Sequence, residues 1–270
     1  MKTYKQTFDE LKTTALIPFF VIGDPDFDTS LAIVKTAIDA GADILELGIP
    51  FSDPIADGPT IQKADIRALD NGMTVKKALD FIKQVKQYRD IPIGLLMYYN
   101  LIYQYGVEKF FNDFHKAGGN SVLVADLSID SADEIEQPAK KAGLDTVFMV
   151  TPNTDEDRMK LIASKTTGFI YTVSLLGVTG GRDQLSTSIE SMVGKLKKIT
   201  KVPICVGFGI SKPEHAVAVA NAGADGVIIG SKIVKIIEEN LNDKQKMLTE
   251  IAQFIKDVKA AIKLASSDRP

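Results

Sequence analysis

Two carboxylates between Leu45 and Gln62 stand where acid/base chemistry can occur. Glu46 lies inside the apolar run Asp43–Gly48, and Asp57 follows on a loop that contains several prolines. A carboxylate in a buried strand is costly unless it is paired or used, because burial disfavours its charged form. Two carboxylates in different surroundings can serve as proton donor and acceptor. A structural Glu beside a capped turn is the alternative interpretation.

The composition argues against several other kinds of chemistry. The chain has 270 residues, is 45% hydrophobic and 25% charged, and carries a net charge of −3, so it offers no strongly basic surface for nucleic acid or an anionic membrane. The lone Cys205 lies in an apolar run and excludes an internal disulfide and a thiolate metal cluster. His115 and His215 fall in helix-like segments, so we expect no metal site.

The amino-terminal segment and the apolar runs bear on location. The first residues, MKTYKQTFDELKT, are charged and lack the apolar core of a signal peptide. No apolar run approaches the roughly 18 residues of a membrane-spanning helix. We therefore expect a cytoplasmic protein.

The elements that must position the carboxylates alternate between strand and helix. The eight expected strands are Leu16–Ile22, Asp43–Gly48, Ile91–Met97, Ser121–Ala125, Thr146–Val150, Gly168–Val173, Val202–Val206 and Gly226–Ile229. Between them, amphipathic spacing predicts helices over Ser30–Asp39, Val107–Ala117, Ala132–Ala142, Asp155–Ala163, Ile189–Ile199 and Pro213–Ala222.

Eight such units in one chain predict an α/β fold of the (β/α)8 TIM barrel type. A doubly wound sheet is the alternative, but the first strand is not followed by Gly-x-Gly-x-x-Gly. We expect one barrel domain over residues 1–270. An extra helix over 1–13 covers the barrel bottom with Phe8 and Leu11, a closing helix spans Gln245–Leu264, and the tail 265–270 is frayed.

Active groups of such a barrel stand at the carboxyl ends of its strands. Alternation along the second strand places Ile44, Glu46 and Gly48 on one face and Leu45 and Leu47 on the other. The face that carries the carboxylate fits the barrel interior and mouth better than the helix layer. Glu46 and Asp57 are therefore expected at the same rim.

Glycine-rich loops follow the sixth, seventh and eighth strands, and a short extra helix is expected after the eighth strand, over Lys232–Glu239. Bare backbone at glycine and unpaired N–H groups at a helix N-terminus suit an anion, and the loops after strands seven and eight form the usual phosphate site of this barrel. Tight turns are the alternative for any single glycine. Arg182 and Lys232 lie nearby and could help to bind a phosphate, although we expect both to be solvated. The apolar residues at strand ends, which default to core packing but could line a substrate pocket, are Phe19, Leu96, Leu123, Met149, Tyr171 and Phe208.

Over nearly its whole length the chain resembles the tryptophan synthase alpha subunit family. The resemblance rests on these motifs in order: PFFVIGDP, LELGIPFSDPIADGPTIQ, PIGLLMYYN, SVLVADL, LLGVTGGR, CVGFGIS and GSKIVKIIE. It implies a (β/α)8 barrel and a lyase that cleaves indole-3-glycerol phosphate to indole and glyceraldehyde 3-phosphate in tryptophan biosynthesis. It also implies that the reaction needs neither a metal nor a cofactor in this chain.

The resemblance assigns roles to individual residues. Glu46 matches the family's proton shuttle, and Asp57 matches the carboxylate that stabilises the cationic indolenine. The indole and glycerol positions are Phe19, Leu96, Leu123, Tyr171, Thr179 and Phe208, with Thr179 on a lid-like loop. The phosphate positions are Gly180, Gly207, Gly209, Gly230 and Ser231.

The resemblance further implies a beta subunit that holds pyridoxal phosphate, joined in an alpha2-beta2 heterotetramer. The positions that match the docking surface are Pro50, Asp53, Pro54, Tyr98 and Asn100. Leu175 and Ser128 depart from residues that some relatives carry, which affects the expected details of loop closure and of docking.

Three alternative functions remain to be compared with this lyase. A freestanding lyase that releases free indole would share every catalytic residue. A non-catalytic activator would not need both Glu46 and Asp57. A phosphosugar isomerase would need an acid/base pair on other strands, which the sequence does not offer.

Overall fold

A single parallel sheet forms the centre of the molecule. The computed structural model describes residues 1–173, 182–207 and 209–267. Within these residues nine strand segments pair in the order β5-β4-β3-β2-β1-β9-β8-β7-β6, and each pairing is parallel. The strands are β1 Ala15–Val21, β2 Leu45–Gly48, β3 Ile93–Met97, β4 Ser121–Val124, β5 Asp145–Thr146, β6 Phe148–Val150, β7 Ile170–Val173, β8 Ile204–Gly207 and β9 Gly226–Ile229.

The ring of strands closes through one interrupted strand. β5 pairs with β4, whereas β6, which begins two residues after β5 ends, pairs with β7. Between them the Val147 N–H donates to the Val122 carbonyl at 3.1 Å, so the strand stays against β4 across the break. The predicted strand Thr146–Val150 therefore occupies one position in the barrel, and the predicted eightfold TIM barrel is confirmed.

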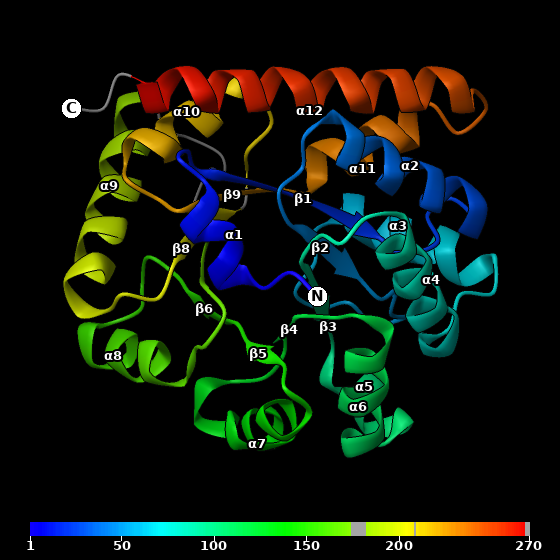
Figure 1. Ribbon diagram of the computed structural model, residues 1–270, viewed down its shortest axis with the longest axis horizontal. Helices are drawn as coiled ribbons and strands as arrows, with labels where there is room; N and C mark the ends of the chain where they lie inside the picture. The colour runs from blue at the N-terminus through cyan, green and yellow to red at the C-terminus, as the bar shows by residue number, and fades with distance from the viewer. Residues whose placement is uncertain (174–181, 208, 268–270) are drawn as a thin grey trace.

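Helices surround the barrel, and α12 runs along the outside over α10 and α2 (Figure 1). The described helices are α1 Tyr4–Glu10, α2 Phe27–Ala40, α3 Pro59–Asp70, α4 Val75–Tyr88, α5 Tyr99–Tyr105, α6 Val107–Ala117, α7 Asp133–Ala142, α8 Glu156–Lys165, α9 Arg182–Ile199, α10 Pro213–Asn221, α11 Ser231–Glu239 and α12 Lys244–Ser267, with a short 3-10 helix at Ile129–Ser131. No described helix is both long enough and apolar enough to cross a membrane.

The helix predictions differ from the structure in several places; for example, α9 begins at Arg182 and not at the predicted Ile189. α3, α4 and α5 were not predicted, although Pro59 at the first turn of α3 and the Thr74 cap of α4, whose side chain accepts the Lys77 N–H, are start signals. The amino-terminal helix is shorter than predicted, spanning Tyr4–Glu10. α12 spans Lys244–Ser267, so it extends beyond the predicted closing helix Gln245–Leu264 at both ends.

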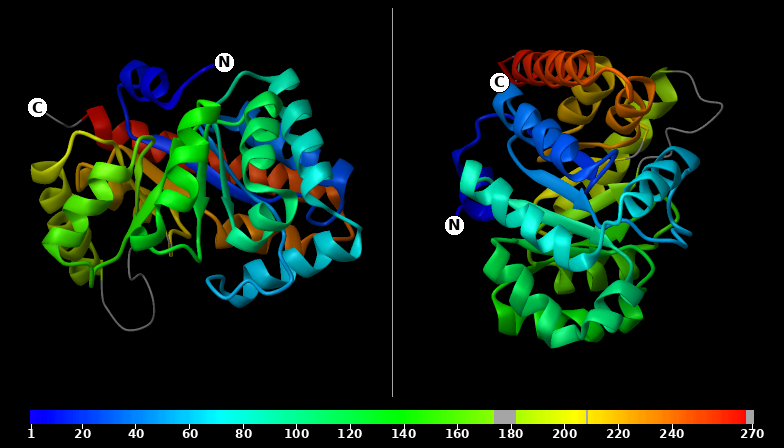
Figure 2. Two further views of the ribbon diagram at one scale, coloured as in Figure 1. Left: turned by 90° about the horizontal axis from the view of Figure 1, so that it is seen from below. Right: turned by 90° about the vertical axis from the view of Figure 1, so that its right-hand side faces the viewer.

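The amino-terminal helix covers one end of the barrel. Thr3 and Gln6 form a reciprocal capping box that starts α1. Tyr4 is buried, and its hydroxyl hydrogen-bonds the Ser121 hydroxyl at 2.7 Å, while Phe8 and Leu11 pack partly buried against the inner cluster of the barrel. Figure 2 shows α1 at one end of the barrel and α3 at the opposite end.

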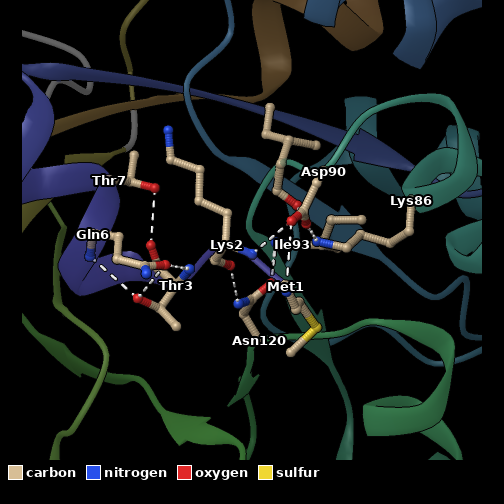
Figure 3. Close-up of polar contacts among 10 residues, drawn as sticks. Met1, Lys2, Thr3, Gln6, Thr7, Lys86, Asp90, Ile93 and Asn120 are labelled. Atoms are coloured by element: carbon tan, nitrogen blue, oxygen red, sulfur yellow. Dashed lines mark hydrogen bonds and ion pairs between the residues drawn. The ribbon is translucent and has the colours of Figure 1, made fainter.

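The segment that precedes α1 is held by a buried amide (Figure 3). The Asn120 side chain donates to the Lys2 carbonyl at 2.9 Å and accepts the Ile93 N–H at 2.9 Å. The Lys2 N–H donates to Asp90, and Asp90 also pairs with Lys86 at 2.5 Å. We call this closed end, formed by Tyr4, Gly94, Asn120 and Ser121, the barrel floor.

Alternation along β2 directs its side chains as predicted. Ile44 belongs to the cluster inside the barrel, and Leu45 and Leu47 belong to the larger cluster between the strands and helices. Glu46 therefore faces inward, between the floor and the opposite end of the barrel, which we call the barrel mouth.

Candidate functional site

Glu46 stands at the base of a cavity in the barrel mouth. It is 3% exposed, and its neighbours in the sheet are Phe19 on β1 and Gly94 on β3. Burial, and next the nearby Asp57 carboxylate, raise the pKa of Glu46 to about 8. A carboxyl with this pKa holds a proton near neutral pH and can still release it, which suits a general acid that becomes a base.

Asp57 approaches the same cavity from the loop between β2 and α3. The Tyr98 hydroxyl, at the end of β3, donates to Asp57 Oδ2 at 2.6 Å and accepts the Ala56 N–H at 3.0 Å. The Tyr98 ring stacks on Phe51, with 5.0 Å between ring centroids. One tyrosine therefore fixes both the fold of the loop and the position of its carboxylate.

The surroundings of the two carboxyls differ. Burial raises the pKa of Asp57, but the Tyr98 hydrogen bond acts in the opposite direction. After burial, the negative charge of Asp57 is the second cause that raises the pKa of Glu46. For Asp57, by contrast, the hydrogen bond from Tyr98 stabilises the ionised form. The arrangement favours a protonated Glu46 beside an ionised Asp57, which is how neighbouring carboxyls take separate acid and base roles.

A third carboxyl lies beside this pair. Asp65 on α3 is 5% exposed, and it accepts a hydrogen bond from the Phe51 backbone. Burial, together with the charge of Asp57, raises the pKa of Asp65 to about 8. By contrast, Asp24 is paired with Arg67 of α3 through two hydrogen bonds of 2.6 and 2.9 Å.

The cavity has a volume of about 350 Å³, within the usual range for small-molecule sites. Its apolar walls come from strand ends and from α3, and its other end lies where β8 and β9 give way to α10 and α11. The ion pair between Lys63 of α3 and Glu238 of α11, at 2.9 Å, joins the helices on its two sides. The lining residues are Phe19, Glu46, Asp57, Gly58, Ile61, Leu96, Tyr171, Gly209, Ile210, Ser211, Ile228, Gly230, Ser231 and Lys232.

Glycines at strand ends leave room for the aromatic walls. A Cβ on Gly48 would lie 2.8 Å from the Phe19 ring, and one on Gly230 would lie 3.2 Å from it. A Cβ on Gly207 would lie 2.3 Å from the Tyr171 hydroxyl. Gly209 has a φ of 76°, which favours glycine. Gly207 thus has a packing reason to be glycine.

Most described residues of the predicted substrate site line this cavity. Phe19, Leu96, Tyr171, Gly209, Gly230 and Ser231 do so together with both carboxylates. Leu123 is instead buried one level lower, beside the small space beneath Glu46, and Met149 packs against the inner cluster. Gly207 does not appear among the lining residues. Thr179, Gly180 and Phe208, and also Leu175, lie outside the described residues.

Two residues predicted for a partner-facing surface are in fact buried. Tyr98 is 3% exposed because its ring stacks on Phe51 and its hydroxyl binds Asp57, and Pro50, which precedes Phe51 in the sequence, is also buried. Asp53 and Asn100 are exposed, and Pro54 is half-buried. Ser128 is exposed and caps the short 3-10 helix, its hydroxyl accepting the Asp130 N–H.

Several lining residues were not predicted from the sequence. Gly58 and Ile61 belong to the start of α3, which was not predicted, although Pro59 marks that start. Ile210, Ser211 and Ile228 sit beside the predicted glycines, so proximity to those glycines was the available signal. Lys232 was expected to be solvated, but it is half-buried and lines the cavity.

The other candidate groups have structural surroundings. Cys205 is buried, and burial raises the pKa of its thiol, as expected of an inert cysteine. His115 is exposed, and the His215 Nδ1 accepts the Ser211 N–H at 3.3 Å. Across the described part of the chain, no group of three or more His, Cys, Asp or Glu side chains is placed to hold a metal ion.

Comparisons with known proteins agree with one another. A family model described as tryptophan synthase alpha chain matches residues 6–263. The tryptophan synthase alpha chain of Methanothermobacter thermautotrophicus is 45% identical over 259 residues, which is 96% of each chain. The crystal structure of tryptophan synthase subunit alpha from Legionella pneumophila superposes with a TM-score of 0.89 at 32% identity, covering 98% of this chain and 99% of that one.

A further similar solved structure comes from a complex of two kinds of subunit, the tryptophan synthase α2β2 complex of Pyrococcus furiosus, and it concerns the structural basis of mutual activation in that complex. The matched chain is 39% identical, with a TM-score of 0.85, and the match covers 92% of this chain and 98% of that one.

Proposed function

The chain belongs to the tryptophan synthase alpha chain family, and from that membership we propose how its cavity cleaves indole-3-glycerol phosphate to indole and glyceraldehyde 3-phosphate. Members of this family are lyases that act in tryptophan biosynthesis. The observation that carries the proposal is the pair of carboxyls in the barrel mouth. Glu46 is buried with its pKa raised to about 8, and Asp57 faces the same cavity from an adjacent loop.

Glu46 carries the proton in both directions. Its protonated carboxyl gives a proton to carbon 3 of the indole ring, which leaves a cationic indolenine. The resulting Glu46 carboxylate then takes the proton of the glycerol hydroxyl next to that carbon. As the new carbonyl forms, the carbon–carbon bond breaks, and its electron pair neutralises the indolenine. Glu46 ends the cycle protonated, so no external base is required.

Asp57 stabilises the charge that develops between these steps. Its carboxylate lies in a partly buried site, where its attraction to the indolenine cation exceeds that in water. This attraction grows as the ring nitrogen becomes positive, so it lowers the barrier more than it strengthens substrate binding. The hydrogen bond from Tyr98 keeps the carboxylate in place before the substrate arrives.

The rest of the cavity suits the two ends of the substrate. Phe19, Leu96 and Tyr171 offer apolar walls to a flat indole ring. Gly209, Gly230 and Ser231 lie where β8 and β9 give way to helices, and α11 begins there with no side-chain cap. Its first backbone N–H groups can therefore bind a phosphate.

We also propose a β subunit as the partner, in an α2β2 heterotetramer in which that partner holds pyridoxal phosphate and condenses indole with serine. The Pyrococcus furiosus relative belongs to such a complex, in which activation is mutual. In this chain Ile55 is 84% exposed, and it precedes Asp57 by two residues. A protein that covers Ile55 and Asp53 would hold the loop that carries the catalytic carboxylate.

Steady-state indole release from indole-3-glycerol phosphate tests the proposal. We expect the purified chain to release indole slowly and a saturating β subunit to raise its turnover ~10–100-fold, equivalent to roughly 1.4–2.7 kcal/mol. An isolated chain that is already as fast as the complex would identify a freestanding lyase. An absence of indole under both conditions would refute the reaction.

A further inference from the structure

The lining of the cavity contains more acidic than basic side chains, although the proposed substrate carries a negatively charged phosphate. The acidic and basic lining residues are Glu46, Asp57 and Lys232, so Lys232 is the only cation among the described ones. A phosphate monoester carries about −1.5 to −2 charges near neutral pH. Such a ligand must enter beside the Asp57 carboxylate, and backbone N–H groups supply only partial positive charge in return.

Lys232 occupies a position that a helix alone does not favour. It is the second residue of α11, whose first turn contains no acidic residue and whose N-cap, Gly230, provides no side-chain cap. A cation there opposes the helix dipole, which has its positive end at the N-terminus. Among the described side chains Lys232 has no hydrogen bond or ion pair, although it is half-buried. Residues that break a local rule without compensation tend to serve function.

An anion between Lys232 and the start of α11 would remove this conflict. It would accept hydrogen bonds from the free backbone N–H groups and would neutralise the ammonium group at the same time. Lys235 lies one turn further along the same helix and provides a contrast. It is 60% exposed and pairs with Glu239 at 3.7 Å, so its charge is already compensated.

We infer that Lys232 is a specificity-determining residue of this active site, whose ammonium group selects substrates that carry a dianionic phosphate. The inference rests on the proposed function, because it assigns the substrate phosphate to the end of the cavity formed by Gly209, Gly230 and Ser231. Lys232 contacts a part of the substrate that does not react, so it contributes equally to the ground state and the transition state. Its loss should raise KM and leave kcat unchanged.

The test compares Lys232→Gln, Lys232→Arg and the matched control Lys235→Gln by calorimetry with two probes, glycerol phosphate and indole. We expect Lys232→Gln to raise the Kd of glycerol phosphate ~10-fold, which is about 1.4 kcal/mol, and to leave the Kd of indole unchanged. Lys232→Arg should restore most of the affinity, and Lys235→Gln should match the parent chain. In steady state, KM for indole-3-glycerol phosphate should rise with kcat retained.

The outcomes separate the inference from the function on which it rests. Equal glycerol phosphate affinity in the parent chain and in Lys232→Gln would overturn the role of Lys232 and leave the phosphate site in place. No glycerol phosphate binding by the parent chain would overturn both. Weakened binding of indole as well, or failure of Lys232→Arg to recover affinity, would indicate a packing role and contradict the inference. Thermal unfolding of each variant confirms that it is folded.

Discussion

The two ends of the barrel use similar side chains for different purposes. At the floor, the Tyr4 hydroxyl pairs with Ser121 at 2.7 Å; at the mouth, the Tyr98 hydroxyl pairs with Asp57 at 2.6 Å. The space directly beneath Glu46 is too small for a water molecule, whereas the cavity above it measures about 350 Å³. The floor thus satisfies its polar groups within a filled interior, and the mouth keeps carboxyls next to open space.

Glycine shows the same contrast. A Cβ on Gly94 would lie 2.6 Å from the Tyr4 hydroxyl, so this glycine admits the group that closes the floor. Gly48 and Gly230 admit the Phe19 ring, which forms a wall of the open cavity. Substitutions at the floor should therefore change stability, and substitutions of the mouth carboxyls Glu46 and Asp57 should change turnover.

The largest effect is expected at Glu46. Glu46→Gln keeps the size of the side chain but cannot transfer a proton, so turnover should fall by ~10²-fold or more. Steady-state indole release by the purified variant measures this, with circular dichroism as the check on folding. Turnover close to that of the parent chain would remove Glu46 from the mechanism.

Asp57 should affect turnover more than affinity. Asp57→Asn retains a hydrogen-bond acceptor for Tyr98 but removes the charge that faces the indolenine, so we expect kcat to fall on the order of 10²-fold with KM changed only modestly. Kinetics across a range of substrate concentrations separate the two parameters. If KM rises steeply and kcat survives, Asp57 binds the substrate and does not stabilise the transition state.

Asp65 should make stability depend on pH. Its pKa is about 8 in the folded chain and about 4 when unfolded, so between these values the folded state holds a proton that the unfolded state has lost. The contribution of Asp65 to the free energy of unfolding is therefore largest below about pH 4 and decreases as the pH rises to about 8. Asp65→Asn keeps an acceptor for Phe51 and should remove this loss.

Urea unfolding at pH 5 and pH 8 measures the Asp65 effect. The free energy of unfolding of Asp65→Asn, taken relative to that of the parent chain, should be at least about 1.4 kcal/mol higher at pH 8 than at pH 5, which is the free energy of one pKa unit. An equal difference between the two proteins at both pH values would show that Asp65 ionises normally.

The smallest effect on turnover is expected at the floor. Ser121→Ala removes the partner of the buried Tyr4 hydroxyl, which should cost about 1–3 kcal/mol of unfolding free energy and leave kcat unchanged. Chemical denaturation and indole release on the same sample measure both quantities. A fall in kcat comparable to that of Asp57→Asn would end the distinction between floor and mouth.

The sequence predicted the barrel because periodicity is a local signal. Alternation placed Glu46 inside and Leu45 and Leu47 outside, and the helix Val107–Ala117 matches α6 at both ends. The start of α3 at Pro59 and the cap of α4 at Thr74 carried signals that went unused. The interruption at Val147 has no such signal, because it depends on how the strand meets two different neighbours.

The candidate site was harder to predict where it depends on packing between distant segments. Tyr98 was placed on the surface because its motif gives no indication of the stacking on Phe51 or the hydrogen bond to Asp57. Lys232 was expected in solvent, but it lines the cavity. For Tyr98 the decisive contacts, with Phe51 and Asp57, join segments far apart in the sequence.

We expect the Glu46 carboxyl in the barrel mouth to be protonated near neutral pH, and a carbon-13 NMR titration of Glu46 measures this. The resonance is assigned by its disappearance in Glu46→Gln. We expect a titration midpoint near pH 8, with a shift toward lower pH in Asp57→Asn because the neighbouring negative charge is gone. A midpoint near the ordinary value of about 4.3, unaffected by Asp57→Asn, would contradict it.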